Sequence, residues 1–429
     1  MDKKTHDAYV RILKTELVPA FGCTEPISIA YAAAKARALL GAVPEHAVVT
    51  ASGNIIKNVK SVVVPGTGGL RGIEAAAAAG FIAGDESLAL EVIEDIPPDK
   101  RVGIRAFSQS GKLSVRQAES ELVFDLSVEA FGGGHSALVR IINDHTNIVL
   151  LRRDSETLFE NDTELTSPTA SVSDDKKLLC MQDIYDFAEG TGPDKVRSVL
   201  ERQIEYNRAI SDEGLSGNWG ANIGRVILSR EGECIRNRAR AAAAAGSDAR
   251  MAGCEKPVVI NSGSGNQGIT VSLPIIVYAE ELGAPREKLL RALALANLVA
   301  IYEKVGIGTL SAYCGAVSAG CAAGAGIAYL KGGDFRAVAH TLVNSLAITS
   351  GIVCDGAKAS CAAKIATSVD AGILGYEMYL EGKQFYGGDG FVKKGVDNTI
   401  RAVGRLGSSG MKYTEKEILD IMLADAENV

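Results

Sequence analysis

Residues 305–330 read VGIGTLSAYCGAVSAGCAAGAGIAYL, and this stretch decides the fold class because no charged side chain interrupts it. It is longer than the ~20 residues that span a bilayer. Thirteen of its 26 residues are Gly or Ala, however, and only six are Val, Ile or Leu. Gly and Ala gain little from contact with lipid, whereas their small size lets helices approach closely. We therefore expect closely packed helices in the core of a soluble protein.

The composition of the whole 429-residue chain agrees with a soluble globular protein. It is 47% hydrophobic and 23% charged, and 45 Lys and Arg against 52 Asp and Glu give a net charge of −7. These values exclude a disordered chain, and no Lys/Arg-rich stripe is present to neutralise nucleic-acid phosphates. The first residues, MDKKTHD, are not followed by the apolar run of a secretory signal. We expect a cytoplasmic protein without a nucleic-acid or membrane partner.

Apolar spacing separates helical from strand-like segments. It predicts helices over 7–20 and 27–40, and Pro26 suits the first turn of the second helix. Between about Leu88 and Arg153 the apolar residues alternate with period two, as in strands. The predicted strands are 48–49, 62–64, Val102-Ile104-Ala106, Leu122–Val128, Leu138–Ile142 and Ile148–Leu151, with a hairpin turn at Asn143–Thr146.

Beyond Leu178 nearly all of the chain has helical, Ala-rich patterns. We predict an α+β fold, in which a strand-bearing N-terminal lobe contains a small antiparallel sheet and the C-terminal lobe is mainly helical. The predicted N-terminal lobe covers 1–153, an exposed linker covers 154–175 and the helical lobe covers 176–429. The linker is expected because Asp, Ser, Thr, Glu and Pro dominate that segment.

Four of the eight cysteines form two similar motifs, Cys314-x6-Cys321-Ala-Ala and Cys354-x6-Cys361-Ala-Ala. Gly, Ala and Ser surround them, so these thiols can crowd around a bulky inorganic centre. Iron–sulfur clusters bind thiolates without close spacing in sequence, whereas zinc knuckles favour C-x2–4-C pairs, which this sequence lacks. Three interpretations stay open: an iron–sulfur cluster, buried cysteines that pack as small apolar residues, and a structural zinc or redox site.

A fifth cysteine, Cys23, comes directly before a predicted helix. A thiol at a helix N-terminus can have a lowered pKa, which suits a nucleophile, a base or a metal ligand, although a packing role fits Cys23 equally well. His135 and His145 fall on the predicted sheet or its turn, where we expect hydrogen-bonded structural roles. No G-x-S-x-G, H-E-x-x-H or G-x4-G-K-[ST] motif occurs.

Four motifs occur in a fixed order along the chain. They are Gly22–Pro26, Pro65–Gly69 with Gly72-Ile73-Glu74, Ser262–Gly268, and Cys354–Lys358 with Cys361–Lys364. In this order they resemble the L-cysteine desulfidase family, which is related to the alpha-chain domain of bacterial iron–sulfur L-serine dehydratases. The resemblance covers about residues 10–405, nearly the whole sequence, and its specificity lies in the combination of the motifs.

The resemblance implies an oxygen-sensitive [4Fe–4S] cluster that acts as a Lewis acid and is held by Cys314, Cys354 and Cys361. Cys321 is then expected to be a packing residue. Three protein ligands leave one iron open to substrate. L-Cysteine would lose its Cα proton and then sulfide, and the resulting aminoacrylate would hydrolyse to pyruvate and ammonia. No pyridoxal phosphate is implied.

The same resemblance implies roles for residues outside the cluster motifs. Cys23 is its candidate for the base, or for a group that exchanges with substrate at the iron. Thr24, Asn54, Ser264 and Asn266 are expected to bind the carboxylate and amino group of the substrate.

The leading hypothesis is therefore a lyase that eliminates sulfide from L-cysteine. The sequence shows no Ser-rich, His-containing motif like that of the dehydratase beta domain, which favours thiol over hydroxyl elimination. L-Serine dehydratase is the alternative enzyme, and a non-catalytic iron–sulfur or thiol sensor is the alternative from another class. We expect a small amino acid as the binding partner, and the sequence leaves a homodimer open.

Overall fold

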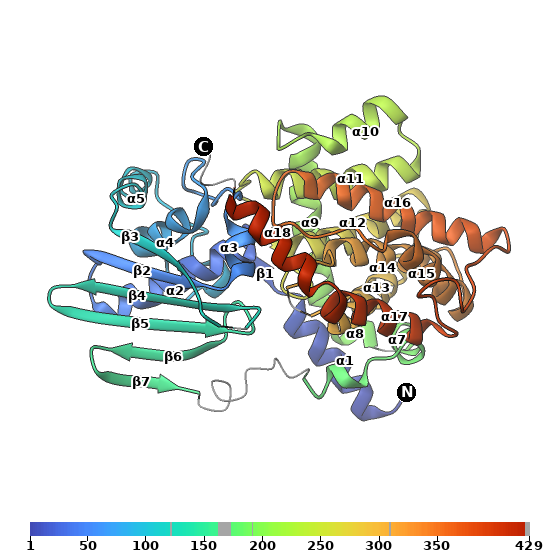
Figure 1. Ribbon diagram of the computed structural model, residues 1–429. Coiled ribbons are helices and arrows are strands. Elements are labelled where there is room, and N and C mark those ends of the chain that lie inside the picture. The colour runs from blue at the N-terminus through green and yellow to red at the C-terminus, as the bar shows by residue number, and fades with distance from the viewer. Residues whose placement is uncertain (121, 162–172, 191, 309, 425–429) are drawn as a thin grey trace.

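A sheet lies at one side of the molecule and a bundle of helices at the other, as Figure 1 shows for the computed structural model. The structure describes residues 1–120, 122–161, 173–190, 192–308 and 310–424. The part with the sheet is called the sheet lobe, and the part with the bundle is called the helical lobe. The predicted α+β fold is confirmed.

The sheet lobe contains one six-stranded sheet with helices against it. Its elements are α2 (Thr24–Leu40), β2 (His46–Ala51), α3 (Gly53–Val59), α4 (Gly72–Ala83), α5 (Lys100–Ser108), β3 (Leu113–Gln117), β4 (Asp125–Gly132), β5 (His135–Ile142), β6 (Ile148–Arg153) and β7 (Glu156–Glu160). The strand order is β3-β2-β4-β5-β6-β7. Alternate residues of β4, among them Leu126 and Val128, are fully buried, and α2 packs on β4 and β5.

The sheet is mixed and not purely antiparallel, which corrects the sequence-based expectation. β2 and β3 are parallel, whereas the remaining neighbours in the sheet are antiparallel. Parallel neighbours need a crossover connection. Here α3, α4 and α5 supply that connection between the end of β2 and the start of β3.

The segment Val102-Ile104-Ala106 is helical, so its prediction as a strand is wrong. It lies within α5, where Ile104 and Phe107 are three residues apart and share the buried face. The Phe107 ring packs edge-on to Phe81 of α4 at 5.9 Å between centroids, while Val102 is 76% exposed. The apparent period of two arose because Val102 is an exposed apolar residue. The predicted strand at 62–64 is reduced to a single bridge between Val63 and Arg71.

The predicted lobe boundaries differ from the structure at two places. Strand β7 continues the sheet within the predicted linker, 154–175, and residues 162–172 of that linker lie outside the described residues. Helix α1 (Lys3–Glu16) belongs to the predicted N-terminal lobe but packs on helices of the helical lobe. The division into independently folding lobes stays a prediction.

The helical lobe follows in sequence. Its principal helices are α7 (Met181–Glu189), α8 (Gly192–Lys195), α9 (Arg197–Ser216), α10 (Ile223–Glu231), α11 (Ile235–Met251), α12 (Gly265–Glu281), α13 (Arg286–Ile307), α14 (Gly315–Leu330), α15 (Phe335–Thr349), α16 (Ser360–Leu380) and α17 (Val396–Arg405). Of the charge-free stretch 305–330, residues 305–307 form the end of α13 and residues 315–330 form the whole of α14. Across the described residues, no helix is long and apolar enough to cross a membrane.

Helices α14 and α16 pack with their backbones in direct contact. A Cβ added at Gly324 would lie 2.5 Å from the carbonyl oxygen of Gly372, and one at Gly320 would lie 2.4 Å from Ser368 Oγ. The same kind of packing joins α2 and α4, where a Cβ at Gly80 would lie 2.1 Å from the carbonyl oxygen of Ala30. The abundance of small residues thus sets the distance between paired helices in both lobes.

A strand pair and a helix are among the contacts that join the lobes. Strand β1 (Pro19–Ala20) pairs antiparallel with β8 (Val258–Val259), so the chain just before Cys23 is fixed beside the chain just before Ser262. The last helix, α18 (Lys412–Ala424), crosses from the helical lobe onto α3 (Figure 1), and the Nζ of Lys57 there contacts Glu415 Oε1 at 2.9 Å.

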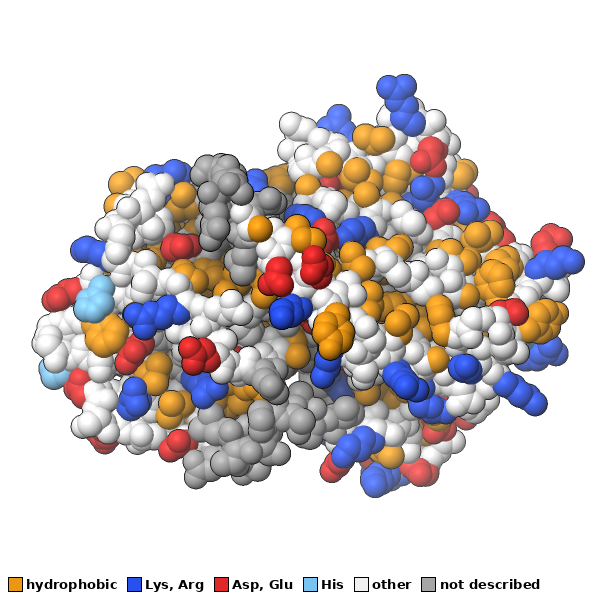
Figure 2. Space-filling view, viewed as in Figure 1, with side chains coloured by type: hydrophobic (Ala, Val, Ile, Leu, Met, Phe, Trp, Pro, Cys, Tyr) orange, Lys and Arg blue, Asp and Glu red, His pale blue; other side chains and the backbone are white. Residues whose placement is uncertain are grey.

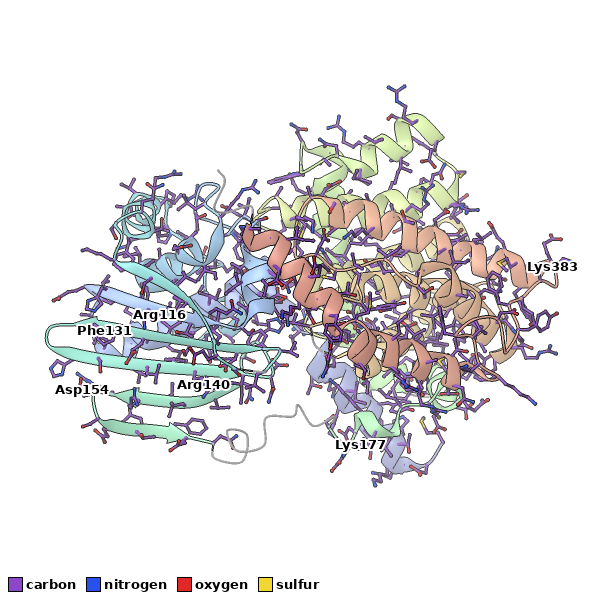
Figure 3. The ribbon with its side chains drawn as sticks, viewed as in Figure 1. Arg116, Phe131, Arg140, Asp154, Lys177 and Lys383 are labelled. Carbon is purple, nitrogen blue, oxygen red and sulfur yellow. The ribbon has the colours of Figure 1, made fainter. Side chains whose placement is uncertain are left out.

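The outer sheet and the surface carry ordinary structural ion pairs. In Figure 3 Arg140 and Asp154 lie on the sheet, where Arg140 binds Asp125 through two hydrogen bonds of 3.0 and 2.8 Å. His135 contacts Asp154 at 2.9 Å, which agrees with its expected structural role. Figure 2 shows basic and acidic side chains interspersed over the visible face of both lobes.

Candidate functional site

A cavity of about 100 Å³ lies between the two lobes. The N-terminal ends of four helices contribute to its wall: α2 with Cys23 and Thr24, α12 with Ser264, α14 with Cys314, and α16 with Cys361. Because the N-terminal end of each helix carries a partial positive charge, this arrangement favours thiolates and other anions inside the cavity.

The three predicted cluster ligands all line this one cavity. Cys314 precedes the first turn of α14, and Cys361 is the second residue of α16. Cys354 lies in the loop between α15 and α16, where its backbone N–H donates to the carbonyl of Ala312 at 2.7 Å. The bridge between Tyr313 and Val353 therefore holds Cys314 and Cys354 side by side.

The charges around these thiols favour one thiolate. The Cys314 thiol donates a hydrogen bond to Cys354, which lowers the pKa of Cys354 and raises that of Cys314. Lys57 and Lys304 also lower the pKa of Cys354, whereas burial opposes them. Burial raises the pKa of Cys361. Cys354 is thus the first of the three to become the charged form that binds metals.

The loop from Cys354 to Cys361 is fastened by the charged residues of its motif. Asp355 pairs with Lys358 at 2.6 Å and also with Lys364, and the Nζ of Lys364 donates to the carbonyl of Val353 at 2.8 Å. Gly356 has a positive φ of 93°, and a Cβ there would lie 2.5 Å from the carbonyl oxygen of Lys57. The glycine therefore allows this loop to approach α3.

The donor set fits an iron–sulfur cluster better than a single metal ion. Among the described residues, no three His, Cys, Asp or Glu side chains gather closely enough to bind one ion. A cluster spreads its thiolate ligands over several irons. Gly315, Ala316 and Ala357 line the cavity beside the thiols, so small residues surround the sulfur atoms. Cys314, Cys354 and Cys361 are the residues that would hold the cluster.

Cys321 lies apart from these ligands. It is fully buried within α14, and its Sγ is 3.3 Å from Thr349 Oγ1. It is not among the residues that line the cavity, and its surroundings agree with the packing role expected for it.

Cys23 lines the cavity, but its pKa differs from the sequence-based expectation. The thiol is 1% exposed, and burial raises its pKa to about 12, although the Arg250 charge opposes the shift. The expected lowering by the helix N-terminus is therefore wrong, because removal from water outweighs the helix dipole. A pKa this high keeps Cys23 protonated near neutral pH.

Three of the four predicted substrate contacts reach the cavity: Thr24, Ser264 and Asn266. Asn54 lies one turn before Lys57 and Asn58 on α3 and does not line it. Helix α3 thus presents Lys57 and Asn58 to the cavity instead. That Asn54 contacts the substrate stays a prediction.

The predicted contacts that do reach the cavity already have protein partners. Thr24 Oγ1 donates to Glu25 at 3.2 Å, and Ser264 Oγ accepts from the N–H of Gln267 at 3.4 Å. Asn266 Oδ1 accepts from Arg250 at 3.2 Å. Arg250 also donates to the carbonyl of Gly22 at 3.0 Å, so it links the α12 loop to the loop before Cys23.

Several polar residues of the cavity wall were missed by the sequence analysis. Lys57, Asn58, Arg250, Gln267 and Lys304 all line it. The signal for Lys304 was a charged pair, Glu303-Lys304, at the end of a long apolar run, and Gln267 was inside a quoted motif. Lys57 and Asn58 carried no local signal, since only the tertiary fold brings α3 to the cysteines.

Five buried polar atoms of the wall have no hydrogen-bond partner within the described structure: Asn58 Oδ1, His145 Nε2, Arg250 Nε, Gln267 Oε1 and Tyr313 Oη. Buried polar atoms are normally satisfied by protein groups, water or a ligand. Five of them around one cavity indicate a site for a small polar molecule. His145 was expected to be structural, and its carbonyl does accept a hydrogen bond from Ser28 at 2.7 Å, but its ring also reaches the cavity.

Comparison with known proteins assigns the chain to a family. The profile of the family described as "Serine dehydratase alpha chain" matches residues 152–420. The chain belongs to this family, which is associated with iron–sulfur dehydratases.

Similar proteins cover the full length of the chain and carry the name UPF0597 protein. The one from Desulfitobacterium hafniense is 54% identical over 97% of each chain. Those from Lachnoclostridium phytofermentans and Treponema denticola are 49% and 43% identical, over 96% and 99% of this chain and 99% and 100% of their own.

Proposed function

We propose that this chain is an iron–sulfur-dependent lyase that eliminates sulfide from L-cysteine. In the overall reaction, L-cysteine and water give pyruvate, ammonia and hydrogen sulfide. The observation that carries the proposal is the convergence of Cys314, Cys354 and Cys361 on one cavity with Cys23. Membership of the serine dehydratase alpha chain family supports the lyase class.

Some residues of the cavity wall would bind the cofactor, and others would bind the substrate or transfer its proton. Cys314, Cys354 and Cys361 would hold a [4Fe–4S] cluster through their thiolates. When bound, such a cluster supplies a Lewis acid that weakens the bond between Cβ and the leaving sulfur. Lys57 and Lys304 place positive charge near Cys354 and favour its thiolate.

Cys23 is the proposed acid–base group for the Cα proton. Its thiol lies in the same cavity, and Arg250 is the neighbouring charge that favours its thiolate. The raised pKa means that Cys23 must lose its proton before it can accept one from Cα. Burial of the cavity between two lobes excludes bulk water from the carbon that loses its proton.

The test is a comparison of L-cysteine and L-serine turnover under anaerobic conditions, with pyruvate and sulfide as readouts. We expect a brown protein with a larger kcat/KM for L-cysteine. A larger kcat/KM for L-serine would make the protein an L-serine dehydratase, the second candidate, which the family description favours. A brown protein inert toward both would be a sensor, and a protein without iron would contradict every cluster hypothesis.

A further inference from the structure

Lys304 is a buried cation of the cavity wall that makes no direct ion pair. The residue is 9% exposed and comes from α13, and within the described structure it makes no hydrogen bond or salt bridge. Burial lowers the pKa of Lys304, and the charges of Cys354, Cys314, Glu25 and Glu415 oppose this shift without direct contact. Lys57, the other lysine of the wall, pairs directly with Glu415 at 2.9 Å. An anionic ligand in direct contact would favour the charged form of Lys304.

Gln267 complements Lys304 with a fixed acceptor. Its side chain is fully buried, and its Nε2 donates to Asn261 Oδ1 at 3.0 Å. Asn261 in turn donates to Asn297 Oδ1 at 3.0 Å, and Asn297 exchanges hydrogen bonds with Gln203. This amide network determines the orientation of Gln267, because the NH2 group must face Asn261. Oε1 is left without a partner within the described residues.

Both groups face the same space beside Gly315. A Cβ built on Gly315 would lie 2.7 Å from Gln267 Oε1 and 3.3 Å from Lys304 Nζ. The acceptor and the ammonium are therefore within about 6 Å of one another. An α-amino acid carries an ammonium and a carboxylate on one carbon, so one such molecule can contact both groups. Glycine at 315 lets both groups lie this close to the backbone, since a Cβ there would clash with Gln267 Oε1.

We propose that Lys304 and Gln267 bind the zwitterionic head group of an α-amino acid, with Lys304 holding the carboxylate and Gln267 Oε1 accepting from the ammonium. The inference rests on the proposed function for the identity of the ligand as an amino acid. It assigns head-group recognition to residues other than Thr24, Ser264 and Asn266, whose side chains already have protein partners. The rest of the cavity then receives the substrate side chain, next to the cysteines.

The test uses ligands that lack a leaving group, so that binding is separated from turnover. L-Alanine has both head groups, propionate lacks the ammonium and ethylamine lacks the carboxylate. Their binding to the anaerobically purified protein is followed by ligand-observed NMR titration. Lys304→Met should weaken L-alanine and propionate about 10- to 100-fold and leave ethylamine within about twofold. Gln267→Leu should weaken L-alanine and ethylamine and spare propionate.

Matched variants separate a binding role from a structural one. Lys304→Arg keeps the charge and should recover part of the affinity for L-alanine and propionate. Lys304→Met should stay folded, since it removes a buried charge that makes no direct ion pair within the described structure.

Three results would overturn the inference: L-alanine that does not bind the wild type, variants that weaken all three ligands equally, or a Lys304→Met protein that loses iron but keeps its L-alanine affinity. A wild type that binds L-alanine through both groups but releases no sulfide from L-cysteine has a different meaning. It would contradict the proposed function and support this inference.

Discussion

The two walls of the cavity are built in different ways. The helical-lobe wall gathers its three thiols from a stretch of 48 residues, Cys314 to Cys361, next to the N-terminal ends of α14 and α16, whose backbones touch. The sheet-lobe wall contributes Cys23, Lys57 and Asn58 from α2 and α3, and it is held against the first by β1–β8 pairing and by α18. Packing between α14 and α16 therefore positions the helical-lobe wall, whereas contacts between distant parts of the chain position the sheet-lobe wall. We expect metal binding to depend on the first and turnover to need both.

The largest effect is expected for Cys354→Ala. It removes the thiol whose pKa is lowered and whose backbone is tied to Ala312, so iron binding should be lost entirely. Cys321→Ala is the matched control because Cys321 is in the same packed layer but outside the cavity. Iron per chain after anaerobic reconstitution is the measurement. Equal losses in both variants would overturn the ligand assignment.

Cys23→Ala tests the sheet-lobe wall and should have the next largest effect. Turnover of L-cysteine should fall by about 100-fold or more, the scale of a lost acid–base group, while iron content stays at the wild-type value. Kinetics and iron analysis on the same preparation distinguish the two walls. Activity close to that of the wild type would remove Cys23 from the chemistry.

A pair of glycine variants compares the packing behind each wall. The added methyl group of Gly324→Ala pushes α14 away from α16, and that of Gly80→Ala pushes α4 away from α2. Each variant should therefore lower the free energy of unfolding by about 1–3 kcal/mol. Only Gly324→Ala should also lower iron content, because a shift of α14 would move Cys314, which lies directly before its first residue. Thermal unfolding and iron analysis report the two effects. Iron loss in the Gly80→Ala protein would mean that the walls are not independent.

The smallest effect is expected at the ion pair between the lobes. Glu415→Gln leaves the buried Lys57 without its counter-ion and should cost about 1–3 kcal/mol, whereas Lys57→Met should cost less because Glu415 is 22% exposed and can be hydrated. Melting temperatures of the two variants provide the comparison. A larger loss for Lys57→Met would show that packing of the lysine stem, and not charge, holds α18 on α3.

Sequence patterns predicted the helical-lobe wall better than the other. The repeated cysteine motifs and the Gly- and Ala-rich segments are local features, so they pointed to four cysteines and to closely packed helices. The family resemblance then separated Cys314, Cys354 and Cys361 from Cys321. Alternation misled at Val102, where an exposed apolar residue imitated a strand. Lys57 and Asn58 could not be predicted, because their approach to the cysteines depends on how the whole sheet lobe docks. The raised pKa of Cys23 could not be predicted from the neighbouring residues in sequence, since its main cause is burial in the folded protein.

The ribbon of β1 and β8 has a consequence for the order of assembly. Pro19 pairs with Val259, which is 240 residues further along the chain, so this contact forms only after most of the protein has been synthesised. The cavity therefore has no counterpart in a nascent chain that ends before Val259. Cys314, Cys354 and Cys361 lie still later in the sequence. The sheet-lobe residues that line the cavity are therefore synthesised before the three thiols that they face.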